Sequence, residues 1–204
     1  MVKNIIFDLG NVLISFRPSD YFDKKKYPEA IKATILSDIF GSKEWSMLDK
    51  GEITTMQAID AISKKSSLNK EEIAHIFNLR TDIIFPLDQN VKLLPELKKQ
   101  GLRLYYLSNF PLDIFDEVRD GYYFFKYFEG GLISAAVKSS KPDSRIYEIL
   151  LERYSLKPEE CLFIDDIEVN VKSAESFGMK GIFTNGSQEI SGKIEKAIKL
   201  LSGF

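Results

Sequence analysis

The sequence has little cysteine, little histidine and little net charge, and each shortage narrows the class of protein. One cysteine among 204 residues excludes a disulfide-stabilised scaffold, and with a single histidine it argues against a zinc site of the Cys/His type. Any metal must therefore be held by oxygen ligands. A formal net charge of −2 argues against the basic surface that nucleic-acid-binding proteins use.

Long apolar runs are also missing. No run approaches the roughly 20 residues that a membrane-spanning helix needs. A strand pattern already begins at residue 3, where a signal peptide would carry its charged segment. The one cysteine, Cys161, lies inside an apolar run, which suits a reducing compartment. We therefore expect a cytoplasmic protein without membrane or nucleic-acid partners.

What the sequence does contain is an apolar strand that ends on a carboxylate. Residues 3–7 are followed at once by Asp8, and then by the flexible pair Gly10 and Asn11. A single charge at the end of a buried strand is costly unless it has a partner or a task. In open α/β sheets this edge is where ligands bind, so Asp8 is the first candidate functional residue.

Further apolar runs alternate with helical patterns along the chain. The strands are predicted at 3–7, 102–107, 131–135, 161–164 and 180–184. Helices are predicted at 87–99, from Pro111, from the loop 139–143 to about residue 154, at 169–177 and from about 189 to 201. This alternation predicts an α/β fold, a Rossmann-like doubly wound parallel sheet with strand order 3-2-1-4-5.

One long segment does not follow the alternation. Between about residues 18 and 78 the apolar spacing is helical throughout, and it contains no strand pattern of useful strength. Turn-forming residues divide the segment into four or five short helices. We expect residues 15–85 to form a helical cap on a core made of 1–14 and 86–204. Trp45 is interpreted as a packing residue of this cap.

Polar side chains follow three of the predicted strands. These are Asp8, then Ser108 and Asn109, then Asp165 and Asp166. Three carboxylates brought to one sheet edge repel one another unless a cation is present, and Mg²⁺ suits an oxygen-only site that stays open to phosphate. Mg²⁺ and Lys141 together would offset the three negative charges, so a phosphate dianion could then enter.

The chain resembles the haloacid dehalogenase superfamily with a helical cap of the C1 type. The resemblance rests on four motifs in the family's order: residues 7–13 around Asp8 and Gly10, residues 107–109, residues 140–147 around Lys141, and residues 163–166 followed by Asn170. The first motif, Asp-Leu-Gly-Asn-Val, is similar to a subgroup that includes bacterial alpha-D-glucose-1-phosphate phosphatases.

The resemblance implies a role for each matching residue. Asp8 would be the nucleophile that forms an aspartyl-phosphate, while Ser108, Asn109 and Lys141 would bind the phosphoryl group. Asp8, the carbonyl of Gly10 and Asp166 would hold Mg²⁺, with Asp165 as a further ligand directly or through water. Asn170 would support the fourth motif. The partner would be a small phosphorylated metabolite.

The sequence departs from the resemblance at Gly10, where most phosphatases of the superfamily carry a second Asp that acts as general acid. Three interpretations stay open. The first is a phosphatase for easier leaving groups such as sugar 1-phosphates, or one that recruits an acid from elsewhere. The second is a 2-haloacid dehalogenase, which needs no such acid, although the Asp165–Asp166 pair argues against it. The third is a catalytically weak domain that binds a phosphometabolite or a protein.

Overall fold

A computed structural model describes residues 1–184, 190, 192–194 and 196. Its centre is a five-stranded sheet in the order β5-β4-β1-β6-β7, and every neighbouring pair is parallel. The strands are β1 (Asn4–Phe7), β4 (Arg103–Ser108), β5 (Gly130–Ile133), β6 (Cys161–Asp165) and β7 (Lys180–Phe183). Counted along the chain this is the order 3-2-1-4-5, so the predicted Rossmann-like sheet is confirmed.

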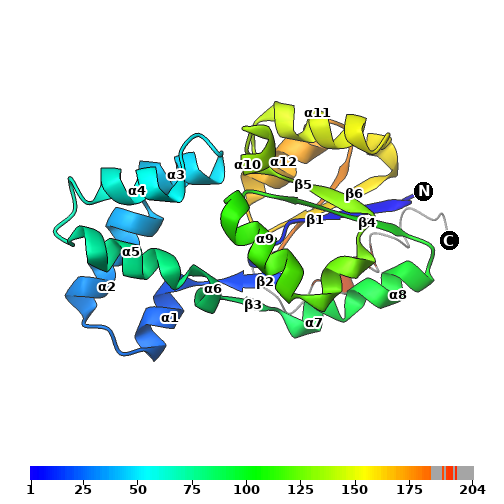
Figure 1. The fold of residues 1–204 in the computed structure, drawn as a ribbon. Helices are drawn as coiled ribbons and strands as arrows, with labels where there is room; N and C mark the ends of the chain where they lie inside the picture. The colour runs from blue at the N-terminus through cyan, green and yellow to red at the C-terminus, as the bar shows by residue number, and fades with distance from the viewer. Residues whose placement is uncertain (185–189, 191, 195, 197–204) are drawn as a thin grey trace.

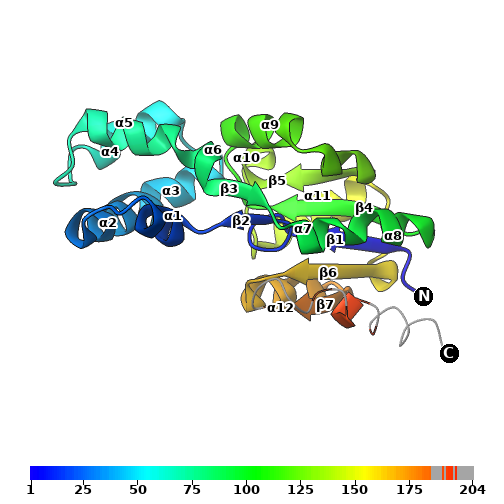
Figure 2. The same cartoon turned by 90° about the horizontal axis from the view of Figure 1, so that it is seen from below.

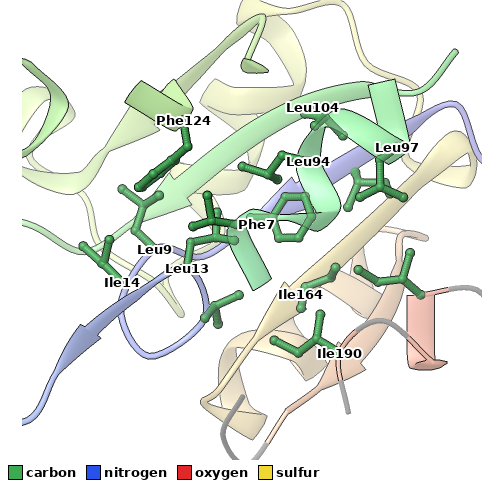
Figure 3. Close-up of a cluster of buried hydrophobic side chains, with 14 of the residues drawn as sticks. Phe7, Leu9, Leu13, Ile14, Leu94, Leu97, Leu104, Phe124, Ile164 and Ile190 are labelled. Atoms are coloured by element: carbon green, nitrogen blue, oxygen red, sulfur yellow. The ribbon is translucent and has the colours of Figure 1, made fainter. Parts of the chain in front are cut away.

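The side chains of β1 alternate between two hydrophobic layers, because successive residues of a strand point to opposite faces. Ile5 and Phe7 pack on one face, and Ile6 packs on the other. Figure 3 shows the first layer, in which Phe7 lies among Leu94 of a covering helix and Ile164 of β6. The complete burial of β1 fixes its register, and with it the position of Asp8.

Helices cover both faces of the sheet, as Figures 1 and 2 show. One face packs against α8 (Leu93–Lys99), α9 (Leu112–Gly121) and the 3-10 helix η2 (Tyr123–Tyr127). The other packs against α11 (Ser144–Arg153) and α12 (Glu168–Ser176). The helix predicted at 87–99 is divided at Lys92 into α7 (Asp88–Val91) and α8. Short elements complete the core: α10 (Ser134–Val137) and η3 (Pro158–Glu160).

The segment predicted to be helical forms a lobe beside the sheet, at the end opposite the N-terminus (Figures 1 and 2). It contains α1 (Pro18–Lys24), α2 (Glu29–Ile35), the π-helix η1 (Leu36–Phe40), α3 (Lys43–Asp49), α4 (Thr55–Ile62), α5 (Lys70–Asn78) and α6 (Arg80–Ile83). We call these helices the helical lobe. They share a hydrophobic cluster of their own around Phe22, Ile39 and Phe77. Capping boxes at Thr54 and Asn69 define where α4 and α5 begin.

A two-stranded antiparallel ribbon connects the helical lobe to the sheet. It pairs β2 (Ile14–Phe16) with β3 (Ile84–Pro86), and Ser15 lies opposite Phe85. Sequence reasoning missed these strands because three residues are too few to show the alternation of a strand. The ribbon brings both ends of the lobe to one place, next to the loop that follows Asp8.

Among the described residues, none of the helices combines the length and the apolar character that crossing a bilayer requires. The helix predicted from about 189 to 201 lies for the most part outside the described residues.

Candidate active site

The carboxyl ends of three neighbouring strands place the first candidate residues together. Asp8 follows β1, while Ser108 and Asp165 are the last residues of β4 and β6. Phe7 aligns with Ile164, and the Asp8 amide donates to the Ile164 carbonyl at 2.8 Å, so Asp8 lies beside Asp165. Because parallel register fixes this alignment, the sheet itself brings the two carboxylates together.

Lys141 lies between the two carboxylates. Its Nζ is 2.9 Å from Asp8 Oδ1 and 2.6 Å from Asp165 Oδ2, and all three side chains are buried. Burial alone would lower the pKa of Lys141, but the two carboxylates outweigh it and the pKa is raised. Lys141 is therefore held as a cation at the centre of the site.

Asp8 itself is a carboxyl group under opposing influences. Burial raises its pKa, Lys141 opposes this, and the nearby Asp165 and Asp166 add to it, so that the pKa of Asp8 is about 7. The Leu9 amide donates to Asp8 Oδ1 at 2.7 Å. A bound cation would favour the ionised form of Asp8, which is the form that can attack a substrate.

Asp165 has protein donors on both of its oxygens. Oδ1 accepts from the Ile167 amide at 2.8 Å and from Asn170 Nδ2 at 3.1 Å. Oδ2 accepts from Lys141 at 2.6 Å and from the same Asn170 amide at 3.1 Å. These contacts fill the four acceptor positions of a carboxylate. The arrangement suits a residue that fixes Lys141 better than one that binds a metal.

Asp166 is the least buried of the three carboxylates. One oxygen from each of Asp8, Asp165 and Asp166 lies within 4.8 Å of the other two, a spacing that could hold a metal ion. Partial burial raises the pKa of Asp166, and the negative charge of Asp165 adds to this effect. Since the oxygens of Asp165 already have donors, Asp8 and Asp166 are the carboxylates available to a cation.

The resemblance assigned Ser108 and Asn109 to binding of the phosphoryl group, and the structure brings both to the same edge of the sheet as Asp8. Asn109 Oδ1 accepts from the Lys141 amide at 2.8 Å, and Asn109 Nδ2 donates to the Lys141 carbonyl at 2.9 Å. Asn109 thus holds the loop that carries Lys141. Ser108 is buried, and within the described part of the chain its hydroxyl has no hydrogen-bond partner. That hydroxyl is free to donate to a phosphoryl oxygen.

A cavity of about 100 Å³ lies between this edge and the helical lobe. From the core it is lined by Gly10, Asn109, Phe110, Pro111 and Ile114, from the ribbon by Phe16 and Ile84, and from the lobe by Trp45, Asp49 and Arg80. Trp45 also stacks on Phe16, so it serves the packing expected of it and faces the cavity as well. Sequence reasoning missed Asp49 and Arg80, because no motif marks either residue.

The chain matches known proteins along most of its length. The sequence model of the haloacid dehalogenase-like hydrolases matches residues 2–178. The chain belongs to this family. It is a hydrolase, and the predicted resemblance is confirmed at the level of the superfamily.

Curated relatives include two phosphatases. The sesquiterpene phosphatase astK of Aspergillus oryzae is 30% identical, and the alignment covers 91% of each chain. The glyceraldehyde 3-phosphate phosphatase of Methanocaldococcus jannaschii is 26% identical over 88% of this chain and 83% of its own length. Phosphatases therefore occur among the relatives that match this chain along most of its length.

Solved structures share the fold. A haloacid dehalogenase family enzyme of Bacteroides thetaiotaomicron, in complex with magnesium and inorganic phosphate, has a TM-score of 0.73 at 24% identity, covering 94% of this chain and 98% of its own. The L-2-haloacid dehalogenase of Xanthobacter autotrophicus, with chloropropionic acid covalently bound, has a TM-score of 0.69 at 20% identity, covering 100% and 84%. A protein that binds magnesium and phosphate and a haloacid dehalogenase thus share this fold, so the fold alone does not identify the reaction of this chain.

Proposed function

We propose that this hydrolase is a Mg²⁺-dependent phosphatase that transfers the phosphoryl group of a small phosphate monoester to Asp8. The observation that carries the proposal is the buried Lys141 between Asp8 and Asp165, with Asp166 close enough to share a cation with Asp8. A buried cation beside a nucleophilic carboxylate suits the transfer of a dianionic group.

The donor set fits Mg²⁺. Asp8, Asp166 and the carbonyl of Gly10 would hold it, because hard oxygen ligands with open positions suit this ion. When bound, Mg²⁺ would offset the repulsion between the carboxylates and an incoming phosphate. With Lys141 it brings three positive charges to the three negative charges of Asp8, Asp165 and Asp166.

The residues of the chain then have separate tasks. An oxygen of Asp8 attacks phosphorus, forming the aspartyl-phosphate bond while the bond from phosphorus to the leaving oxygen breaks. The Lys141 ammonium and the Ser108 hydroxyl stabilise the negative charge on the transferred group. Water then attacks phosphorus, releases inorganic phosphate and restores Asp8. Asp165 and Asn109 keep Lys141 in place through both steps.

The lining of the cavity supports a proposal for the substrate class. Aromatic and aliphatic side chains form the larger part of its lining, namely those of Phe16, Trp45, Ile84, Phe110, Pro111 and Ile114. Its polar groups are largely engaged: Asn109 holds Lys141, and Arg80 donates to Phe77, Thr55 and Asp113. A sugar would leave several hydroxyls unpaired here, at a cost for each. We infer a short apolar or aromatic alcohol as the leaving group. The astK relative, named a sesquiterpene phosphatase, supports the apolar character of the leaving group.

The dehalogenase interpretation makes different demands. A halide leaves without a proton, and such a site needs neither Asp166 nor a cation. The proximity of Asp166 to Asp8 therefore favours the phosphatase. Halide release from 2-chloropropionate in the presence of EDTA would support the dehalogenase, and activity toward neither substrate would support a binding domain.

The direct test uses Asp8→Asn and a panel of aryl and alkyl phosphates with Mg²⁺. We expect phosphate release to fall at least about 10⁴-fold, the scale at which loss of a nucleophile acts. EDTA should abolish the activity of the unaltered protein, and Mg²⁺ should restore it. The matched control is Asp60→Asn, since Asp60 is a surface carboxylate of the helical lobe paired with Lys70. Full activity of Asp8→Asn, or activity in EDTA, would contradict the proposal.

A further inference from the structure

The departure at Gly10 leaves a chemical need unmet. The alcohol of a phosphate ester is a poor leaving group unless its oxygen is protonated as the bond breaks. General acid catalysis of this kind raises the rate about 10²–10⁴-fold. Gly10 supplies no proton. A Cβ built there would meet no described heavy atom within 4 Å, so the space beside the loop is open. That space is part of the cavity under the helical lobe.

Asp49 reaches the same cavity from the opposite side. It is the last residue of α3, and its carbonyl accepts a hydrogen bond from the Ser134 hydroxyl of the core. Two residues on, Gly51 lies so close to Ala135 that an added Cβ would come within 2.4 Å of the Ala135 carbonyl oxygen. These contacts hold the end of α3 against the core, so Asp49 has a fixed position at the cavity.

The carboxyl group of Asp49 is not engaged by the protein. Within the described residues it makes no hydrogen bond and no ion pair, and Arg80 acts on it only as a nearby charge. Arg80 donates instead to Asp113, at 3.0 Å. Burial raises the pKa of Asp49 to about 7, partly opposed by Arg80. A carboxyl group with a pKa near 7 can hold or release a proton at neutral pH, and Asp49 lines the cavity in which a leaving group would lie.

We propose that Asp49 is the general acid of this hydrolase, supplied by the helical lobe in place of Gly10. The inference rests on the proposed phosphatase function. As the bond from phosphorus to the leaving oxygen breaks, the Asp49 carboxyl gives its proton to that oxygen and the alcohol departs. The resulting carboxylate then accepts a proton from the water that attacks the aspartyl-phosphate. One water is consumed, and one alcohol and one phosphate are released.

The test compares Asp49→Asn with the unaltered protein on phosphates whose leaving groups range from 4-nitrophenol to simple alkanols. We expect the kcat/KM of the variant to fall about 10²–10⁴-fold on alkyl phosphates. With 4-nitrophenyl phosphate, a burst of nitrophenol equal to the enzyme concentration should precede slow turnover, because this leaving group departs without a proton. The dependence of kcat/KM on the pKa of the leaving group should therefore be steeper in the variant. Asp60→Asn serves as the control.

Two further variants separate an acid from a packing residue. Asp49→Glu keeps a carboxyl group and should retain more activity on alkyl phosphates than Asp49→Asn. Gly10→Asp, which the open space accommodates, should recover part of the activity of Asp49→Asn.

An equal loss of kcat/KM for every leaving group, or no loss, would overturn the role of Asp49 while leaving the phosphatase intact, because kcat/KM reports the step in which the leaving group departs. An unaltered protein that releases no phosphate would contradict the proposed function, and the role of Asp49 with it.

Discussion

The charged side chains on the two sides of the cavity differ in how they are paired. On the sheet side, Asp8, Lys141 and Asp165 are buried and joined at 2.6 to 2.9 Å. On the side of the helical lobe, Arg80 is paired with Asp113, whereas the Asp49 carboxyl group has no hydrogen-bond partner among the described residues. One side has its charges fixed by their neighbours, and the other holds a carboxyl group that is free to exchange a proton.

This difference matches a division of labour. Phosphoryl transfer needs a nucleophile and a cation at fixed positions, and paired charges supply them because each orients the other. Proton transfer needs a group that is stable with and without its proton near neutral pH, which a paired carboxylate is not. In the proposed mechanism the sheet side carries out phosphoryl transfer, and the lobe supplies the proton for the leaving group.

Removing the charge at the centre of the sheet side should cause the largest change in stability. Lys141→Met leaves Asp8 and Asp165 buried without a cation, and loss of one partner from a buried ionic group costs about 3–5 kcal/mol. We expect the free energy of unfolding in urea to fall by this amount. Lys172→Met is the control, because Lys172 and Glu168 form an exposed pair that contributes little. Equal effects of the two variants would contradict the central place of Lys141.

The sheet side was also the side that the sequence could predict. Asp8, Ser108 and Asp165 stand at or next to the ends of recognisable strands, and parallel strands bring their carboxyl ends to one edge. Lys141 lies in the loop before α11, and the resemblance indicated its place at the site. The part that required the structure was the second layer of contacts. No pattern indicates that Asn109 would bracket the Lys141 backbone, since this depends on how two loops approach each other.

The lobe side could be predicted only in outline. Helical spacing and turn residues gave its secondary structure, but the three-residue strands β2 and β3 were too short to detect. Asp49 and Arg80 stand on separate helices, α3 and α6, without a motif. Their place at the cavity follows from helix packing and from the ribbon, which are properties of the folded chain.

The unpaired carboxyl group of Asp49 should lower the stability of the fold at high pH. Because the pKa of Asp49 is raised to about 7 in the fold, ionisation favours the unfolded chain, and stability is lost as the pH rises from about 4 to about 7. Asp49→Asn cannot ionise, so at pH 8 it should be more stable than the unaltered protein by about 2 kcal/mol, a value already reduced for the partial exposure of Asp49. Near pH 4 the two proteins should be equally stable. Thermal unfolding across this pH range measures the difference.

The control for that experiment is again Asp60→Asn. Its ion pair with Lys70 lowers the pKa of Asp60, so this substitution gives no gain at high pH. A gain for Asp49→Asn that is the same at every pH would mean that packing, and not ionisation, is responsible. A variant that gains stability while losing activity on alkyl phosphates would show that the lobe side sacrifices stability for function.

The smallest effect should come from loosening the contact between the two sides. Asp113 of α9 accepts from Arg80 at 3.0 Å and from Thr55 at 2.7 Å, which ties the helical lobe to the core. Asp113→Asn keeps an acceptor but removes the charge, and since Asp113 is half exposed the loss should be about 1 kcal/mol or less. Hydrogen exchange around α6 should nevertheless increase, and KM should rise with little change in kcat, because the lobe closes the cavity over the substrate.

Asp116→Asn, on the same helix and paired with Arg119 at the surface, should change neither. If Asp113→Asn lowered kcat as much as Asp49→Asn does, the contact would position the acid itself, and the two sides would be coupled more tightly than their separate pairing indicates.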